Sequence, residues 1–395
     1  MKEPLAQEST SVSRRDLIIG VAAGVAACAP RLAAAQGQGQ GEGPASGARQ
    51  PMRDYSPGAP PVGYPDPDII TYDPAFNSLR VNNTAIHRLW TGAMWSEGPA
   101  WCSLGRFLVW SDIPNNRQLR WLEENGQVSV FRSPSNNSNG NTFDFQGRQI
   151  SCEHALRRLV RYEHDGAVTV IADSFGGMRL NSPNDVAAHP DGSYWFTDPP
   201  AGFQLYEGAP EPEGPGSPVG VLRSRVGQLA GVGMYKREIP TANVYRADSS
   251  GKVDMVVKQA DLPGNPNGIL FSPDYKRLYI IANGGLVSCE VNGARVGSAK
   301  EFCDFMVDGV KCRTDGARCD VQGNVWAGTR INEGRDMNFA GATVWSPQGK
   351  LIGRIRLPEI CANLTFGGPK RNRVFMTAGQ SLYAVYTATQ GAAPA

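Results

Sequence analysis

The sequence predicts an all-β fold, a six-bladed β-propeller. Six segments repeat one pattern, in which an apolar strand, a turn rich in Pro, Asp, Gly or Asn and a second apolar strand follow one another. Most of these segments precede a second hairpin, and two hairpins in about 40–50 residues make a four-stranded propeller blade. The composition agrees, because 46 Gly and 29 Pro suit many tight turns, while 41% hydrophobic residues can fill a large core.

The six repeats are spaced almost evenly along the chain. Counted between their turn residues, the steps are 42, 45, 83, 48 and 48 residues, and those residues are Gly105, Gly147, Gly192, Tyr275, Gly323 and Arg371. The last repeat has only one further strand, 382–387, so we expect the strand at 85–90 to close the ring. The 83-residue step contains one blade plus a Pro/Gly-rich insertion, residues 200–240, after the second strand of the third blade.

The residues before the repeats have the composition of a targeting segment. Paired arginines, Arg14 and Arg15, precede an apolar stretch at 17–27, which is too short to span a membrane, and small residues at 33–35 resemble a cleavage site. We therefore expect a twin-arginine-type signal peptide at 1–35, recognised by the twin-arginine export machinery, and a periplasmic or secreted protein. Cys28 loosely fits a lipid-anchor site. Residues 36–65 read as a flexible linker, and residues 66–390 as the propeller.

Charge and cysteine content exclude several classes of protein. The formal net charge is +2, which gives no basic surface for nucleic acid, and no apolar run is long enough for a transmembrane helix. Beyond Cys28 there are seven cysteines without CxxC spacing, which argues against a zinc site. Cys303, Cys312 and Cys319 are close enough in sequence for one disulfide, although the sequence does not define a pairing.

Six oxygen-bearing side chains fall at the same place in the six repeats. Counting eight residues back from each turn residue gives Glu97, Asn139, Asn184, Asn267, Asp315 and Asn363. Asn and Asp next to Gly are common turn formers, but turn preference explains neither Glu97 nor the shared position. Because the innermost strands line the central channel, these side chains should meet around its axis. Two carboxylates with amide oxygens favour calcium over zinc, so we expect a central divalent cation site.

Other candidate residues fall at the same end of the channel. About seven residues after each turn residue the second strand returns there, which places His154, Asp198 and Arg330 near the mouth. A single buried histidine is often structural, yet His154 would lie beside the cation site as an acid/base group or a substrate contact. The 200–240 insertion leaves from this end and would cover the site. A surface excursion or a contact between copies is the alternative.

Five motifs together resemble the gluconolactonase / senescence-marker-protein (regucalcin-like) family, and more narrowly its exported bacterial gluconolactonase-like subgroup. The resemblance covers about residues 85–385 and rests on SEGPAW, NSPNDV, HPDGSYWFTDP, NPNG and TDG. It implies a six-bladed propeller that hydrolyses sugar lactones and binds one divalent metal ion, commonly Ca²⁺, with Zn²⁺, Mn²⁺ and Mg²⁺ as alternatives. The implied metal ligands are Glu97, Asn184, Asn267 and Asp315. One departure is Ser182, where regucalcin-like members have an arginine.

These residues suggest a mechanism for hydrolysis of a small-molecule lactone. Asp315 would act as ligand and general base or as nucleophile, and His154 would protonate the leaving alkoxide. The implied substrate contacts are Asn139, Asn141, Asn184, Asp198 and Arg330, while Asp185 would steady the ligands. A metal-dependent phosphotriesterase or aryl esterase, and a non-enzymatic ligand-binding propeller, are the alternative functions.

Overall fold

The computed structural model describes residues 51–200 and 237–392, which belong to the unit Gln50–Ala395. The predicted signal peptide, Cys28, the first part of the predicted linker and nearly all of the predicted insertion lie outside the described residues. Within the described ranges the regular structure consists of strands and three short 3₁₀ helices, η1 (Pro74–Ser78), η3 (Gln259–Asp261) and η4 (Met337–Phe339). No helix in these ranges is long and apolar enough to cross a membrane.

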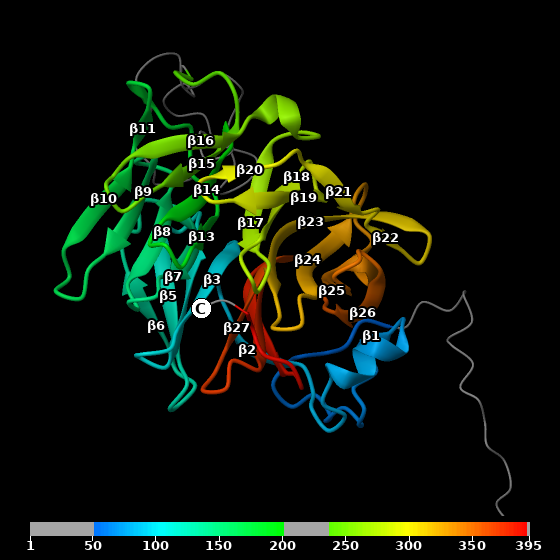
Figure 1. Cartoon of the computed structure of the whole chain (residues 1–395). Coiled ribbons are helices and arrows are strands. Elements are labelled where there is room, and N and C mark those ends of the chain that lie inside the picture. The colour runs from blue at the N-terminus through cyan, green and yellow to red at the C-terminus, as the bar shows by residue number, and fades with distance from the viewer. Residues whose placement is uncertain (1–50, 201–236, 393–395) are drawn as a thin grey trace, which may run out of the picture. The chain divides into compact units, whose positions relative to one another are not determined.

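The strands form six antiparallel sheets, which are the predicted blades (Figure 1). Blade 1 contains β3 (Ser96–Cys102), β4 (Phe107–Asp112), β5 (Arg117–Leu122) and β6 (Val128–Arg132). Blade 2 contains β7 (Ser138–Phe143), β8 (Gln149–Glu153), β9 (Arg158–Tyr162) and β10 (Val168–Ala172). Blade 3 contains β13 (Val186–Ala188), β14 (Tyr194–Asp198), β15 (Asn243–Ala247) and β16 (Val253–Val257). A small hairpin, β11 (Ser174–Phe175) with β12 (Met178–Arg179), joins blades 2 and 3.

The remaining blades are more elaborate at their outer edges. Blade 4 contains β17 (Pro266–Phe271), β18 (Arg277–Ala282), β19 (Gly285–Asn292), β20 (Arg295–Val296) and β21 (Lys300–Cys303). Blade 5 contains β22 (Met306–Val307), β23 (Val310–Cys319), β24 (Val325–Ile331), β25 (Gly341–Trp345), β26 (Leu351–Arg356) and β1 (Ile69–Thr71). Blade 6 contains β27 (Cys361–Gly367), β28 (Arg373–Ala378), β29 (Ser381–Tyr386) and β2 (His87–Thr91).

The ring closes as the sequence predicts. Strand β2, which comes from the N-terminal side of the propeller, pairs with β29 as the outermost strand of blade 6, with His87 opposite Ala384. The first strands of the blades contact one another in sequence around the axis, and β27 of blade 6 contacts β3 of blade 1. Blade 6 therefore combines strands from both ends of the unit, and the backbone hydrogen bonds between β2 and β29 close the ring.

Apolar clusters lie between the blades and hold them side by side. Each of the six interfaces has its own buried cluster: Trp110 packs with Phe375 between blades 1 and 6, and Trp195 lies with Leu278 between blades 3 and 4. The other interfaces are filled in the same way. All seven cysteines of the described ranges are buried free thiols, so Cys303, Cys312 and Cys319 form no disulfide and contribute as small core residues instead.

Part of the predicted linker is packed against the propeller. The Tyr55 ring contacts the Tyr383 ring edge-on, with centroids 5.2 Å apart, and the Arg53 guanidinium lies 4.6 Å over Tyr55 while pairing with Asp66 at 2.6 Å. Within residues 51–65, Arg53 and Tyr55 therefore contact the propeller, while most of residues 56–65 are exposed.

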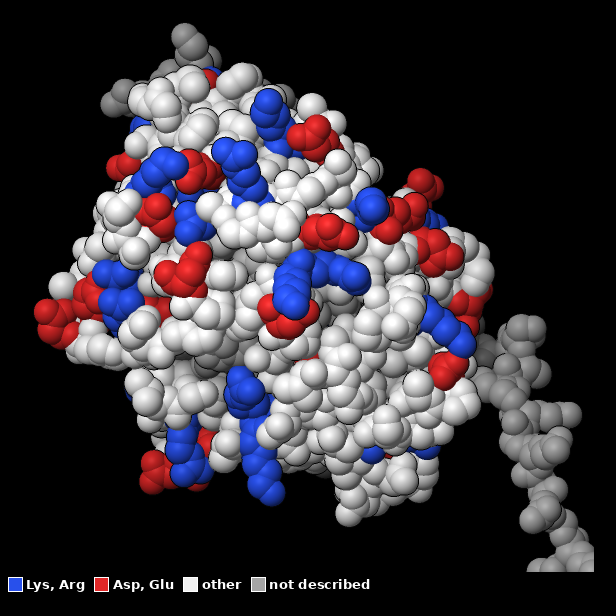
Figure 2. Space-filling model, viewed as in Figure 1, with Lys and Arg blue, Asp and Glu red and all other residues white. Residues whose placement is uncertain are grey.

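The visible surface mixes both signs of charge. Figure 2 shows Lys and Arg interspersed with Asp and Glu on the face turned to the viewer, without a continuous basic area there. This agrees with the near-neutral composition and gives no support on that face to nucleic-acid binding.

Candidate active site at one end of the central channel

The predicted oxygen-bearing residues come together where the six first strands begin. A glycine follows four of them, at positions 98, 140, 268 and 316, and lies against the ring residue of the next blade. A Cβ on Gly140 would lie 2.6 Å from the Asn184 carbonyl oxygen, and one on Gly268 would lie 2.5 Å from that of Asp315. Glycine therefore allows the strands to approach closely enough for the six residues to surround the axis.

Two carboxylates of this ring lie close enough for their charges to interact. Glu97 is buried and Asp315 is partly buried, and burial raises the pKa of each carboxyl above its ordinary value. The negative charge of Asp315 raises the pKa of Glu97 further, whereas Arg330, Asn267 and Arg313 oppose the rise at Asp315. Two interacting carboxylates beside amide side chains make a site in which a cation would be stabilised.

The donor set fits a hard divalent cation. No three His, Cys, Asp or Glu side chains of residues 51–200 and 237–392 form a metal-binding group, so a cation held by Glu97 and Asp315 would also need the amide oxygens of Asn184 and Asn267. Oxygen-only sets of this kind suit Ca²⁺. The Cys361 thiol lies close enough for both carboxylates to raise its pKa, but burial already keeps it protonated.

The Asn141 side chain is held by residues of blades 1 and 2. Asn141 donates from its amide to Gly98 O at 2.9 Å and accepts from Gln118 at 3.0 Å and Gln149 at 3.1 Å. This side chain is fully engaged between the blades, and Ser111 Oγ together with the same Asn141 amide supports the Asn139 carbonyl. In the structure Asn141 thus supports the backbone of Asn139, and its role as a substrate contact stays a prediction.

His154 lies beside Asn139, as the sequence predicts. Its Nε2 is 3.4 Å from Asn139 Nδ2, and burial lowers the pKa of the imidazole to about 4. His154 is consequently neutral at pH 7. A neutral imidazole can accept one hydrogen bond and donate one, but it is not an acid that readily gives up a proton at this pH. This differs from the role of proton donor that is expected for His154 from the sequence.

Asp198 organises the loop that carries Asn184. Its two carboxylate oxygens accept hydrogen bonds from the backbone amides of Ser182, at 2.7 Å, and Asn181, at 2.8 Å. Burial raises the pKa of Asp198 to about 7. Ser182 itself donates from Oγ to the Pro199 carbonyl. Asp198 is thus placed to hold this loop. The sequence could not predict these contacts, because the partners of Asp198 are backbone groups.

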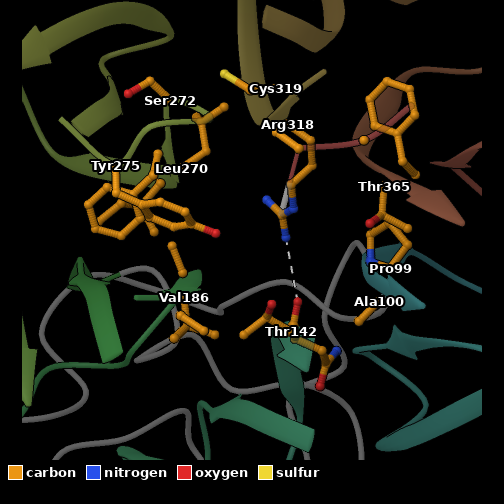
Figure 3. A pocket seen from close by; sticks show the side chains of 18 residues that line it. Pro99, Ala100, Thr142, Val186, Leu270, Ser272, Tyr275, Arg318, Cys319 and Thr365 are labelled. Carbon is orange, nitrogen blue, oxygen red and sulfur yellow. Dashed lines mark hydrogen bonds between the residues drawn. The ribbon is translucent and has the colours of Figure 1, made fainter. Parts of the chain in front are cut away.

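Arg318 crosses the channel below the ring and was not singled out from the sequence. Its guanidinium donates to Ala317 O at 2.9 Å and lies 3.5 Å from both Asp185 Oδ2 and Asn141 O. Figure 3 shows the Arg318 side chain reaching toward the strand that carries Thr142. Asp185 is buried, follows Asn184 directly, and its charge acts on both Glu97 and Asp315. Arg318 therefore balances a third carboxylate of the channel.

Beyond Arg318 the channel becomes apolar. A small cavity of about 40 Å³ there is lined mainly by the second halves of the same first strands, including Val186, Leu270 and Phe366, with Tyr275 at its side (Figure 3). The polar ring and the apolar cavity thus occupy opposite sides of Arg318.

The fold and the ring define a class of protein, the six-bladed propellers with an oxygen-rich polar site at one end of the channel. Within this class, residues 95–380 match the family model described as the SMP-30/Gluconolactonase/LRE-like region. The chain belongs to that family, and the resemblance of its motifs to the family is confirmed, whereas membership of the exported bacterial subgroup stays a prediction.

Individual relatives support the same assignment. The chain is 26% identical over 351 residues to a gluconolactonase of Zymomonas mobilis, which covers 82% of this chain and 87% of the relative. A solved gluconolactonase of Xanthomonas campestris is 28% identical, with a TM-score of 0.67, and covers 84% of this chain and 99% of that one. A calcium-binding regucalcin of Agrobacterium tumefaciens, 19% identical with a TM-score of 0.57 over 77% of this chain and 94% of that one, shares the fold.

Proposed function

We propose that this protein is a metal-dependent lactonase that hydrolyses a sugar lactone and uses Ca²⁺. The observation that carries the proposal is the pair of interacting carboxylates, buried Glu97 and partly buried Asp315, within a ring of amide side chains at one end of the channel. The relatives named gluconolactonase support lactone hydrolysis as the reaction. The calcium-binding regucalcin neighbour is consistent with Ca²⁺ as the ion.

The cation is expected at Glu97, Asn184, Asn267 and Asp315. When bound, it supplies Lewis acidity toward the lactone carbonyl and favours the ionised form of both carboxyls. The charges of Arg330 and Arg313 also favour ionised Asp315. Asp315 is then able to accept a proton from water as the water oxygen attacks the carbonyl carbon.

The other residues orient the substrate and complete proton transfer. Asn139 and Asn184 would hold the sugar oxygens, and Arg330 would lie beside them. The ring C–O bond breaks, and the alkoxide takes a proton that is returned from Asp315. With a pKa of about 4, neutral His154 orients Asn139 through its ring nitrogen instead of serving as the acid expected from the sequence.

A lactone panel with and without a chelator tests this proposal. A pH-indicator assay should show acid release from sugar lactones, abolished by chelator and restored by Ca²⁺. Turnover of phosphotriesters or aryl esters alone would indicate the alternative hydrolases, and absence of any turnover would indicate a binding protein. Restoration by Zn²⁺, Mn²⁺ or Mg²⁺ but not Ca²⁺ would contradict the choice of ion.

We also propose that the chain is exported through the twin-arginine machinery to the periplasm or beyond. The support is the arginine pair Arg14–Arg15 before an apolar stretch. Replacing both arginines by lysine should retain the protein in the cytoplasm, whereas normal fractionation of that variant would contradict the route. Cys28→Ser separates a lipid anchor from a freely released form.

A further inference from the structure

Two arginines lie side by side next to the candidate catalytic carboxylate. Arg313 on β23 is directly opposite Arg330 on β24, and Asp315 follows Arg313 by two residues. Directly opposed residues of antiparallel strands have neighbouring side chains on one face of the sheet. Both guanidiniums act on the Asp315 carboxyl, and the charge of Arg313 opposes that of Arg330. Their mutual repulsion therefore has to be offset by another interaction.

Within the described residues the charges of Asp315 and Glu97 offset this repulsion, but neither arginine forms a direct hydrogen bond or ion pair there. Some half-buried arginines elsewhere pair with a carboxylate, as Arg117 does with Asp112 at 2.9 Å, and others stack on aromatic rings, as Arg120 does over Phe107 at 5.6 Å. Within residues 51–200 and 237–392, Arg313 and Arg330 do neither. The buried Nε of Arg313 lacks a hydrogen-bond partner there, and such a group normally has one.

A turn of blade 4 packs closely against Arg313. Gly284, in the turn between β18 and β19, has a φ of +77°, and a Cβ on it would lie 2.8 Å from Arg313 Nε. Only glycine allows this close approach, so the turn fixes the position of the Arg313 side chain.

The charges of the channel leave these two arginines in excess. Asp185 is balanced by Arg318, 3.5 Å away. A divalent cation would balance Glu97 and Asp315. Arg313 and Arg330 would then remain as two uncompensated positive charges beside the reacting group, and paired guanidiniums bind carboxylate or phosphate well.

Building on the proposed lactonase function, we propose that the substrate is an acidic lactone, one that carries a carboxylate or phosphate group in addition to its ring ester. Arg313 and Arg330 bind this anionic group and thereby position the ring ester over Asp315. They are specificity-determining residues.

The test compares one neutral and two anionic lactones. Initial rates are measured with D-glucono-1,5-lactone, D-glucaro-1,4-lactone and 6-phospho-D-glucono-1,5-lactone. The wild type should prefer at least one anionic lactone over the neutral one in kcat/KM. In Arg313→Gln/Arg330→Gln, that preference should fall about 100-fold or more, as expected for loss of two charged hydrogen-bonding groups. The lactone that is affected more tells carboxylate from phosphate.

Two control variants separate recognition from structure. Arg313→Lys/Arg330→Lys keeps the charge and should retain part of the preference, mostly through a higher KM. Arg120→Gln removes a half-buried arginine that also lacks a carboxylate partner, and its selectivity should equal that of the wild type. Equal kcat/KM for neutral and anionic lactones in the wild type, or equal losses on both in the double Gln variant, would overturn the inference.

Binding measurements keep this inference distinct from the lactonase proposal. If the wild type hydrolyses no lactone, the proposed function fails, and calorimetric titrations with D-gluconate, D-glucarate and 6-phospho-D-gluconate then decide the anion site. D-gluconate carries one carboxylate, whereas D-glucarate and 6-phospho-D-gluconate each carry a second anionic group. Tighter binding of either of these two than of D-gluconate, lost in the double Gln variant, supports the site. Equal or absent binding of all three refutes it.

Discussion

The two ends of the central channel are built from the same six strands but have opposite chemistry. At the end where the first strands begin, Glu97, Asp315 and the amide residues surround the axis, whereas two or three residues further along, the strands present Ala100, Val186 and Leu270 to a small apolar cavity. The position of a residue along its first strand therefore decides whether it lies at the polar or the apolar end of the channel. Changes at the polar end should affect chemistry, and changes at the apolar end should affect packing.

The largest expected effect is at the polar end, in Asp315→Asn. Loss of the proposed base and cation ligand should reduce kcat/KM for lactones by about 10³-fold or more. The free energy of unfolding should stay equal or rise, because one of two repelling carboxylates is removed. Lactone assays and urea denaturation measure the two quantities.

A matched change at the other end gives the contrast. Thr365→Val keeps the shape of a buried residue that lines the apolar cavity, so its kcat/KM should stay close to the wild-type value. If Asp315→Asn remained active, the proposed role of the ring would be refuted, and a large activity loss in Thr365→Val would remove the distinction between the ends.

The next largest effect is expected for Gly140→Ala, because Gly140 allows the first strands of blades 2 and 3 to approach closely. The new Cβ would lie 2.6 Å from the Asn184 carbonyl oxygen and from the Asp185 Cα, so blades 2 and 3 must separate at the ring. We expect a loss of about 3 kcal/mol in the free energy of unfolding and weaker Ca²⁺ binding measured by calorimetry.

An outer-turn glycine provides the control for that variant. Gly166 has a φ of +89° and open space around its Cβ position. Gly166→Ala should cost about 1 kcal/mol through backbone strain alone and leave Ca²⁺ affinity unchanged. Equal Ca²⁺ affinity in Gly140→Ala and Gly166→Ala would show that the ring tolerates wider spacing.

The sequence predicted the fold and the ring well because both repeat. Turn residues recur at steps of 42, 45, 48 and 48 residues, with one step of 83 where the insertion lies, and the ring residues recur with them. Periodicity therefore located Glu97 and Asp315 without information on their neighbours. The sequence could not predict contacts that do not repeat. Examples are the hydrogen bond between Asn141 and Gln118, those from the 181–182 backbone to Asp198, and the ion pair of Arg318 with Asp185.

Arg318, which divides the two ends, should affect stability. Arg318→Met would leave Asp185 buried without its ionic partner and lower the free energy of unfolding by about 3 kcal/mol. The double variant Asp185→Asn/Arg318→Met removes both charges and should recover much of that loss. Urea denaturation of the wild type, both single variants and the double variant gives the coupling energy, and purely additive changes would show that the two residues do not interact.

The smallest effect is the pH dependence that His154 adds near the polar ring. Burial lowers the pKa of this imidazole from 6.5 to about 4 in the folded protein. Between these values the unfolded chain binds a proton that the folded chain does not, so the free energy of unfolding should rise with pH across this range, by up to about 3 kcal/mol at most. Denaturation at pH 4.5 and 7 should show this rise in the wild type and a smaller one in His154→Gln. His164→Gln, which replaces an exposed histidine bonded to Gln146 O, should behave as the wild type. If His154→Gln kept the full dependence, the imidazole would not be the group that titrates, and its neutral role beside Asn139 would lose its support.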